Sequence, residues 1–381
     1  MKREVAITGF GALSAFGYGE EPIRRHVFAG VPGFRPVTRF ASNRYRSSIA
    51  AESDGCPRQR EVLLACARAA LSMAGSPDIA RSAVLVGTQG DFTTLHAFWE
   101  NAGAPRMVDI VESVAASQSE LLAAALGIDG RTVAFNNGCV AGSNAIIHGC
   151  ELIAAGKEDC AIAGGCYVLD EEFFAKFDSG KAFAKDGRLR AFSADRSGLL
   201  LGDGAAVLVL EEKGRALARG ARCLATIPGW GMAGDGFHVC QPHPNGDGLA
   251  AAIRKALRRA GIGPEEVSYV NAHGTGTRLN DIAETRAIKQ ALGDVARRVP
   301  VSSTKTTTGH TLEASGALET VISLIALRDG VIPPTAGYSA PDGECDLDYV
   351  PNEPRAARLH RVLNVSSAFG GINTAILLGS A

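Results

Sequence analysis

Short, β-rich apolar runs alternate along the chain with longer segments of helical period, and this alternation constrains the fold more than any other feature. In the first half the strand-like and helix-like segments are, in order, 5–12, 60–75, 83–90, 119–127, 132–139, 142–156 and 160–169. The strand-like runs are continuously apolar, which is typical of strands that helices cover on both faces. The sequence therefore predicts an α/β protein whose sheets lie in the interior.

A second series of the same kind follows the first. The first series ends in the strand-like run GAAVLVLEE, and the pattern starts again after the basic connection KGRALARGAR. Such a break between two similar series indicates a domain boundary. We therefore predict an N-terminal half at 1–212 and a C-terminal half at 213–381.

Two short echoes indicate that the halves arose by duplication. TGFGA at 8–12 resembles PGWGM at 228–232, and CVAGSNAII at 139–147 resembles AFGGINTAI at 368–376. The echoes fall in the same order, at the first strand of each half and at a late strand-to-helix turn. This order predicts a pseudo-twofold protein with its site between the halves.

The composition excludes several classes of protein. Lys and Arg total 39 against 40 for Asp and Glu, so net charge gives no reason to expect nucleic acid or an anionic membrane as partner. The nine cysteines are an odd number without a CxxC pair, which favours a reducing, cytoplasmic location. The N-terminus is interpreted as a strand and turn, not a signal peptide, and no run approaches the roughly 20 apolar residues of a membrane helix.

Cys139 is the candidate nucleophile. It follows the strand-like TVAFNNG and precedes the helix-forming AGSNAIIHGCELIAAG, so we expect it at a helix N-terminus. There the helix dipole favours a thiolate, and a lowered pKa would make the sulfur reactive. The alternative is an inert cysteine buried in apolar packing, and Cys66, Cys150, Cys160 and Cys166 are interpreted in that way.

Two loops carry further polar candidates. NAHGTGT at 271–277 places His273 directly after an apolar strand, in a loop whose glycines allow close backbone approach. SSTKTTTGHTLEASGALE at 302–319 presents Lys305 and His310 before an apolar helix, and both side chains can reach into a cleft. Taken alone, His273 fits a structural histidine equally well, and Lys305 fits a solvated surface cation.

Other chemistries lack their signatures. One cysteine and two histidines, far apart and without a local pair, do not have the spacing of a zinc site. The chain has no GxSxG elbow of a serine hydrolase, no P-loop and no GxGxxG dinucleotide spacing. We therefore expect neither a metal nor a nucleotide cofactor.

Taken together, six segments resemble the elongating β-ketoacyl-[acyl carrier protein] synthases, over nearly the whole chain. They are VAITGFGALSAFG, NNGCVAGSNA, FSADRSGLLLGDGAAVLVLEE, NAHGTGTRLNDIAET, SSTKTTTGHTLEASGALE and SSAFGGINTAILL, in that order. The resemblance implies the thiolase-like fold, a five-layered αβαβα sandwich of two pseudo-twofold-related halves. It also implies decarboxylative Claisen condensation of an acyl thioester with a malonyl carrier protein, in fatty-acid, polyketide or polyene synthesis.

The resemblance assigns roles to the candidate residues. Cys139 would take the acyl group, and His273 and His310 would promote malonyl decarboxylation and stabilise the enolate. Lys305 would adjust the electrostatics around His310. The backbone N–H groups of Cys139 and Phe369 would form the oxyanion hole, with Phe369 also acting as a gate.

Partners follow from the same resemblance. Thr275 and Thr277 would hold the pantetheine arm, which arrives on the carrier protein, so no resident cofactor is implied. Because carrier proteins are acidic, a local basic patch is expected, with Arg190 as first candidate beside Lys185 and Arg188. The family forms dimers through sheet edges of the N-terminal half, and the apolar run 160–169 is predicted to be that edge strand.

Three positions depart from the family pattern, and two other functions stay open. Asn137 and Val140 flank the nucleophile, where they can reshape its pocket, and Ala368 stands where glycine is usual. If position 368 needs positive φ, alanine would cost about 1 kcal/mol or more. One alternative is a mainly structural, chain-length-determining subunit of a heterodimer. The other is a thiolase-like acyl transferase without decarboxylation, which His310 disfavours because thiolases have a second cysteine there.

Overall fold

The apolar strand-like runs form one mixed sheet, in a computed structural model that describes residues 3–55, 57–93 and 107–381. The order of strands is β11-β10-β14-β15-β9-β1-β8-β7-β5-β6, and β2 pairs with β1. The strands of this sheet are β1 (Val5–Ser14), β2 (Gly17–Tyr18), β5 (Ala83–Gly87), β6 (Thr132–Phe135), β7 (Cys160–Tyr167), β8 (Gly204–Glu212), β9 (Ala225–Gly234), β10 (Tyr269–Asn271), β11 (Val301–Ser302), β14 (Arg361–Ala368) and β15 (Ile372–Gly379).

The sheet is built from two halves with the same topology. From the centre outward, one half runs β1, β8, β7, β5, β6 and the other runs β9, β15, β14, β10, β11. In both halves the first two pairings are antiparallel and the last two are parallel. The halves join where β1 pairs with β9 in antiparallel fashion, Ala6 opposite Thr226 and Ile7 opposite Ala225. The predicted boundary after residue 212 falls between β8 and the helix α8 (Lys213–Ala218).

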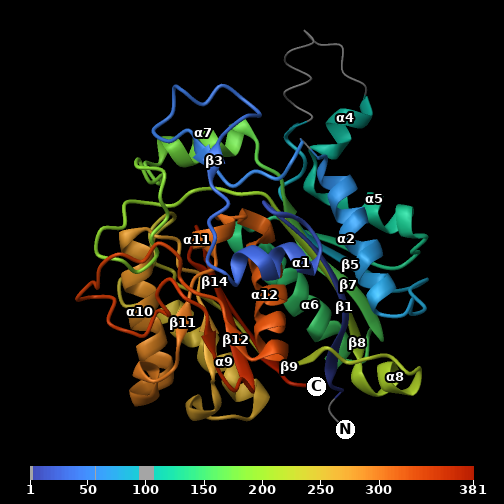
Figure 1. Cartoon of the computed structure of the whole chain (residues 1–381). Coiled ribbons are helices and arrows are strands. Elements are labelled where there is room, and N and C mark those ends of the chain that lie inside the picture. The colour runs from blue at the N-terminus through green and yellow to red at the C-terminus, as the bar shows by residue number, and fades with distance from the viewer. Residues whose placement is uncertain (1–2, 56, 94–106) are drawn as a thin grey trace.

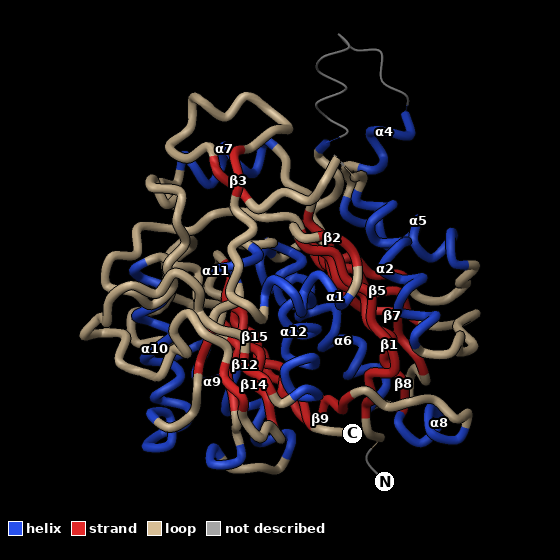
Figure 2. Tube along the Cα trace, in the orientation of Figure 1, coloured by secondary structure: helices blue, strands red, loops and turns tan. Residues whose placement is uncertain are grey.

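Helices cover the sheet in layers. Between the two halves lie α6 (Ala141–Ala154) and α12 (Ser315–Asp329), which pack against each other and against strands of both halves. On the outside, α2 (Gln59–Met73) and α5 (Ala115–Leu126) cover the first half, and α9 (Asp247–Ala260) and α10 (Arg278–Leu292) cover the second. Figures 1 and 2 show α6 and α12 enclosed between the two groups of strands. The result is the five-layered αβαβα sandwich of the thiolase-like fold.

The TGFGA and PGWGM echoes lie at equivalent places in the two halves. A Cβ atom on Gly11 of β1 would lie 2.1 Å from the carbonyl oxygen of Cys66 on α2. A Cβ atom on Gly231 of β9 would lie 2.1 Å from the carbonyl oxygen of Ala252 on α9. Because a side chain at either position would collide with helix backbone, both strands need glycine to let the outer helix approach.

Shorter elements connect these layers. The shorter helices and strands are α1 (Glu20–Pro22), α4 (Met107–Glu112), α7 (Glu171–Ser179), α8 (Lys213–Ala218), α11 (Lys305–Thr308), β3 (Arg35–Pro36), β4 (Ile49–Ala50), β12 (Val331–Ile332) and β13 (Arg355–Ala356). A π-helical turn spans Ile23–Val27, and 3-10 turns span Gly138–Val140, Pro264–Glu266, Gly293–Arg297 and Leu312–Ala314. Among the described residues, no helix combines the length and apolarity needed to span a bilayer.

The predicted edge strand is wrong. The run 160–169 contains β7, which pairs with β5 on one side and β8 on the other, so it lies inside the sheet. The edge of the N-terminal half is β6, which pairs only with β5 among the described strands and is partly exposed along its length. Continuous apolarity reports burial of both faces of a strand, and an interior strand meets that condition better than an edge strand does.

Candidate functional site

Cys139 lies where the sequence places it, at the start of the central helix α6. It is the middle residue of the 3-10 turn Gly138–Val140, which follows β6 and runs directly into α6. Gly138 has φ +70, a left-handed conformation that favours glycine. The turn packs against the end of β14 and against the turn Leu312–Ala314, both from the other half. Cys66, Cys150, Cys160 and Cys166 are buried and free, as predicted.

The thiol of Cys139 has the opposite pKa shift from the one predicted. Its residue is 7 % exposed, and burial raises the pKa of the Cys139 thiol to about 12, with a smaller increase from the carboxylate of Glu313. The cation of Lys305 lowers that pKa, but less than burial raises it. The helix dipole acts over the first turn only and is modest beside full desolvation. In the unloaded protein Cys139 is therefore a neutral thiol.

His273 is fixed by the backbone hydrogen bonds of its own loop. The N–H groups of His273 and Gly274 donate to the two carboxylate oxygens of Glu284 on α10, at 2.6 and 2.7 Å. Within the described part of the chain, His273 Nδ1 is buried without a hydrogen-bond partner. The carboxylate thus holds the loop while the imidazole stays free to meet a ligand.

His310 is placed by contacts with both halves. Its backbone N–H donates to the Leu200 carbonyl at 2.7 Å, which ties the loop to the segment before β8. Its Nδ1 lies 3.0 Å from the hydroxyl oxygen of Ser315 at the start of α12. The rings of His273 and His310 lie 5.3 Å apart, centroid to centroid, nearly perpendicular.

Lys305 is not a surface cation. It is fully buried at the start of α11, and its ammonium group is paired with the carboxylate of Glu319 on α12. Burial, with the nearby Lys305 cation, lowers the pKa of His273 and of His310 well below the ordinary value. Both imidazoles are therefore neutral at pH 7, each with one N–H to donate.

Phe369 lies directly after β14, next to the segment that adjoins the nucleophile turn. Its side chain is 55 % exposed and stacks on Phe177 of α7, with ring centroids 5.8 Å apart. Ala368 ends β14 and has no positive φ, which falls at Gly370 and Gly371 instead. The conditional strain predicted for Ala368 therefore does not arise. A Cβ on Gly138 would lie 3.5 Å from Ala368 Cβ, so the gate segment adjoins the nucleophile turn.

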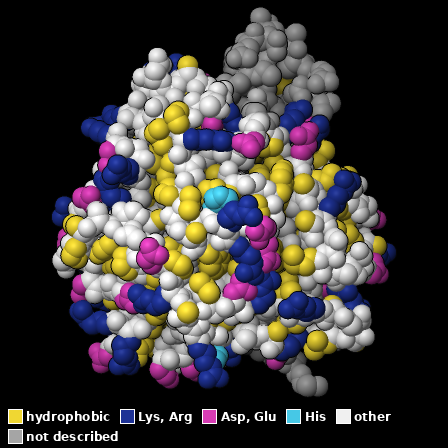
Figure 3. Space-filling model, viewed as in Figure 1, with side chains coloured by type: hydrophobic (Ala, Val, Ile, Leu, Met, Phe, Trp, Pro, Cys, Tyr) yellow, Lys and Arg dark blue, Asp and Glu magenta, His cyan; other side chains and the backbone are white. Residues whose placement is uncertain are grey.

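The remaining predicted residues lie on two loops. Thr275 and Thr277 follow His273, and their hydroxyl oxygens lie 2.8 Å apart. Arg190 is largely buried and pairs with Asp186 and Asp195, so its contact with a carrier protein stays a prediction. Its neighbours Lys185 and Arg188 are exposed. On the face shown in Figure 3, Lys and Arg side chains are interspersed with Asp and Glu.

Sequence reasoning missed three buried carboxylates that surround the candidate residues. Glu284 holds the loop of His273, Glu319 pairs with Lys305, and Glu313 follows His310 by three residues. All three are at most 2 % exposed, and burial raises the pKa of each to about 7. Their signal in the sequence was a glutamate inside an otherwise apolar or small-residue run, as in HTLEASGALE.

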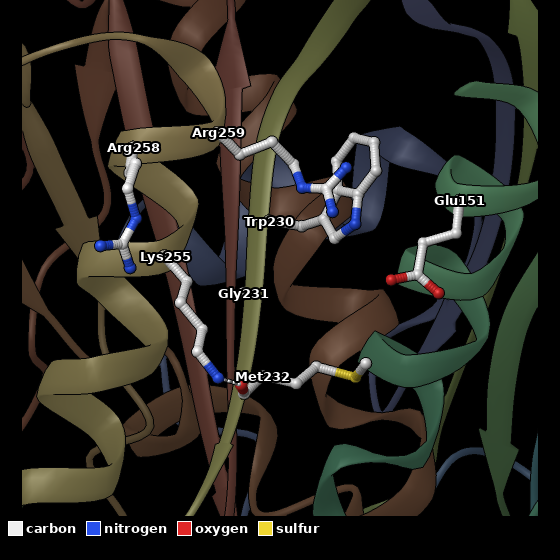
Figure 4. A pocket seen from close by; sticks show the side chains of 7 residues that line it. All are labelled: Glu151, Trp230, Gly231, Met232, Lys255, Arg258 and Arg259. Carbon is white, nitrogen blue, oxygen red and sulfur yellow. Dashed lines mark hydrogen bonds between the residues drawn. The ribbon is translucent and has the colours of Figure 1, made fainter. Parts of the chain in front are cut away.

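A separate cavity lies elsewhere, and none of the predicted site residues lines it. It has a volume of about 470 Å³ and lies between β9, α9 and the C-terminal part of α6. Figure 4 shows the Arg259 guanidinium over the Trp230 ring, 4.2 Å from its centroid, and Lys255 donating to the Met232 carbonyl at 2.8 Å. The candidate site is therefore the one around Cys139.

The two halves contribute complementary groups to that site. One supplies a cysteine at a helix N-terminus, and the other supplies two neutral histidines, a buried lysine and the segment that adjoins the cysteine turn. A cysteine whose turn contacts the segment that follows a neutral histidine suits the transfer of an acyl group through a thioester. On this fold and site, the protein is a thiolase-like acyltransferase.

Comparisons with known proteins give the family. Residues 50–216 match the model of the β-ketoacyl synthase N-terminal domain, and residues 224–339 match that of the β-ketoacyl synthase C-terminal domain. The chain is 35 % identical to 3-oxoacyl-[acyl-carrier-protein] synthase 2 of Coxiella burnetii, over 99 % of this chain and 98 % of the relative. It is 36 % identical to the ketoacyl synthase alpha subunit of the tetracenomycin polyketide synthase of Streptomyces glaucescens, over 99 % and 97 %.

Comparison with solved structures also indicates a ketosynthase. The ishigamide ketosynthase/chain length factor superposes with a TM-score of 0.93 at 33 % identity, covering 100 % of both chains. The chain belongs to the β-ketoacyl synthase family.

Proposed function

We propose that the protein is a β-ketoacyl-[acyl carrier protein] synthase that condenses an acyl group held on Cys139 with a malonyl unit held on a carrier protein. The observation that carries the proposal is the meeting of the Cys139 turn with the segment that follows His310, beside a second neutral histidine. The relatives named as 3-oxoacyl-[acyl-carrier-protein] synthase and as polyketide ketoacyl synthase support it.

The first step transfers the acyl group. The sulfur of Cys139 attacks the thioester carbon, the carrier thiol leaves, and the proton of Cys139 passes to that thiol. Charge that develops on the thioester oxygen is met by the backbone N–H groups of Cys139 and Phe369, because the two segments adjoin. Two easier acyl transfers thus replace one difficult step.

The second step forms the carbon–carbon bond. Malonyl thioester loses carbon dioxide, and the electron pair left behind forms an enolate whose oxygen accepts hydrogen bonds from His273 and His310. When the Ser315 hydroxyl donates to His310 Nδ1, the proton of this imidazole is on Nε2, where it can face the enolate. The enolate carbon attacks the acyl-Cys139 carbonyl, so that the β-ketoacyl carrier thioester leaves and the sulfur is regenerated.

The buried ion pair between Lys305 and Glu319 supports this step. The cation helps keep both imidazoles neutral, since a second positive charge beside it is unfavourable. A neutral imidazole donates one hydrogen bond from a fixed position at no cost in reorganisation. Lys305 therefore acts through the histidines.

We further propose that the carrier protein's pantetheine arm enters past Thr275 and Thr277, and that the protein works as a dimer. The paired threonine hydroxyls beside His273 offer hydrogen bonds to the arm's amides. The open, partly exposed edge of β6 supplies unpaired backbone groups for a second subunit. That subunit is either a second copy or a related chain.

A second candidate function is a mainly structural role in a heterodimer. It is favoured by the similarity to the ishigamide ketosynthase/chain length factor, a pair in which one member is described as a chain length factor. A structural subunit would not need a reactive cysteine, so acylation of Cys139 decides between the two.

The test is intact-protein mass after incubation with a panel of acyl carrier thioesters, followed by malonyl carrier and measurement of released carbon dioxide. We expect one acyl group on the protein and on the matched control Cys150→Ala, which removes a buried thiol of α6, the helix that follows the Cys139 turn. Cys139→Ala should remain unmodified. His273→Ala and His310→Ala should be acylated but release less β-ketoacyl product. Acylation of Cys139→Ala, or none of the unaltered protein beside a candidate partner subunit, would overturn the proposal.

A further inference from the structure

One carboxyl group acts on the Cys139 thiol more strongly than any other charged group. Lys305 and Glu319 form a buried pair, with side chains 1 % and 3 % exposed, so their fields largely offset each other. His273 and His310 are neutral, as argued above. The remaining ionisable group that acts strongly on the thiol is Glu313, the largest influence on it after burial.

Glu313 is held against the nucleophile helix by tight backbone packing. It is the middle residue of the 3-10 turn Leu312–Ala314, which contacts the Cys139 turn. A Cβ on Gly142, three residues after Cys139, would lie only 2.7 Å from the Glu313 carbonyl oxygen. Leu312 adopts φ +40, a conformation strained for leucine that brings the turn into this position.

The carboxyl group of Glu313 is buried without a cation beside it. Its residue is 1 % exposed, and the side-chain amide of Gln89 donates a hydrogen bond to it. Among the residues that the structure describes, Glu313 forms no ion pair. Lys176 acts on it weakly from α7, and that lysine is engaged with Glu172 at 2.7 Å. A neutral amide partner leaves the charge of Glu313 free to act on its surroundings.

We propose that Glu313 controls the ionisation of Cys139, so that the thiol reacts faster when the Glu313 carboxyl is neutral. This deepens the proposed function, because thiolate formation precedes acylation of Cys139. Glu313 acts through Cys139 and is a positioning residue, not a catalytic one.

The direction of the effect follows from the charges. Burial raises the pKa of Glu313 to about 7, so the carboxyl ionises between about pH 6 and pH 8. A negative charge beside the thiol disfavours the thiolate and raises its pKa further. As pH rises through 7, the fraction of Cys139 that is thiolate increases. The negative charge that forms on Glu313 over the same range raises the pKa of the thiol and partly offsets this increase.

The other ionisable groups near the two turns do not reproduce this behaviour. Burial also raises the pKa of Glu319 to about 7, but Glu319 is paired with Lys305 and raises the pKa of the Cys139 thiol less than Glu313 does. His273 and His310 have pKa values well below the ordinary range. Tyr167 of β7 stays neutral, because burial raises the pKa of its hydroxyl. Burial also raises the pKa of Asp170 to about 7, but Asp170 is not among the largest influences on the pKa of Cys139. Asp170 is therefore a matched control.

The experiment is alkylation by iodoacetamide from pH 6 to pH 9.5, with the rate at Cys139 followed by peptide mass so that exposed Cys240 does not interfere. The sulfur forms a carbon bond, iodide leaves and the thiol proton goes to solvent, so no acyl substrate is needed. Removing one nearby charge shifts a buried thiol by about one pKa unit, or about tenfold in thiolate. A thiolate of lower pKa is also a weaker nucleophile, so the gain in rate is smaller than the gain in thiolate. We expect Cys139 of Glu313→Gln to be alkylated about three- to fivefold faster at pH 8 than Cys139 of the unaltered protein.

Three further results keep the test decisive. Asp170→Asn, which retains the oxygen that caps α7, should stay within about twofold of the unaltered protein. Glu313→Asp keeps the charge and should keep the profile. The unaltered protein should show a flattened rise in rate near pH 7, which checks the proposal even where Glu313→Gln does not fold. A profile rising evenly through pH 7, or an unchanged rate for folded Glu313→Gln, would overturn it; failure of acylation alone would bear only on the proposed function.

Discussion

Replacing Lys305 by methionine removes one charge of the buried Lys305–Glu319 pair while nearly keeping the volume of the side chain. Both side chains are at most 3 % exposed, so the carboxylate that remains has neither water nor a cation. Breaking such a pair costs about 3–5 kcal/mol. At about 2.1 cal/mol/K per residue, the 381 residues give an unfolding entropy of about 0.8 kcal/mol/K, so the midpoint of thermal unfolding should fall by about 5 °C.

The pH dependence of this defect has a definite sign. Burial raises the pKa of Glu319 to about 7, above its value of about 4.3 in an unfolded chain, and loss of Lys305 raises it further. In the variant the folded state therefore binds more protons than the unfolded state between these values, so stability falls as pH rises. Because the unaltered protein shares this shift up to about pH 7, the defect relative to it should be small near pH 5 and should grow as pH rises above 7.

Differential scanning calorimetry at pH 5 and pH 8 measures both effects. Lys213→Met is the matched control, because Lys213 pairs with Glu4 at the surface and should lose less than about 1 kcal/mol. The double variant Lys305→Met, Glu319→Leu should recover most of the stability but none of the activity, because two well-packed apolar side chains can replace a buried pair. A loss of under about 1 kcal/mol for Lys305→Met, or a double variant as unstable as the single one, would refute the reasoning.

Three further outcomes are expected. Gly11→Ala should lower stability by about 3 kcal/mol, because its Cβ would meet helix backbone at 2.1 Å, whereas Gly343→Ala, with open space around it, should change the thermal midpoint by less than 1 °C, or about 0.5 kcal/mol. Tyr167→Phe should raise stability by about 1 kcal/mol in chemical denaturation, because in the described structure its hydroxyl is buried without a partner; a loss would show that the hydroxyl has one. Glu284→Gln should lower kcat for condensation about tenfold, because it weakens the two backbone hydrogen bonds that hold the His273 loop. Acylation of Cys139 should then be retained, and a parallel loss of acylation would argue for a structural effect.

The periodicity of the sequence located most of the elements correctly. The helix-like run 60–75 is α2 at 59–73, and 142–156 is α6 at 141–154. These agree because a buried strand and an amphipathic helix each need their own spacing of apolar side chains. The repeated glycines of TGFGA and PGWGM also marked equivalent places in the two halves, because a helix that closely approaches a strand leaves room only for glycine at the contact.

Three features needed the tertiary structure. The edge of the N-terminal half is β6 and not β7, because strand order depends on which strands pair and not on apolarity. The direction of the Cys139 pKa shift depends on burial in a core cluster drawn from both halves, which outweighs the local helix dipole. Lys305, which in isolation fits a surface cation, is buried because Glu319 from α12 meets it there.

The sequence by itself determined the α/β layering, the duplication and the identity of the polar residues at the carboxyl ends of the strands, because each depends on local spacing and residue chemistry. Only the tertiary structure decided which charges face Cys139, which of them are paired, and how far burial shifts their pKa values. Those quantities depend on distances between side chains on different elements, such as the turns that carry Cys139 and Glu313, which no local pattern encodes.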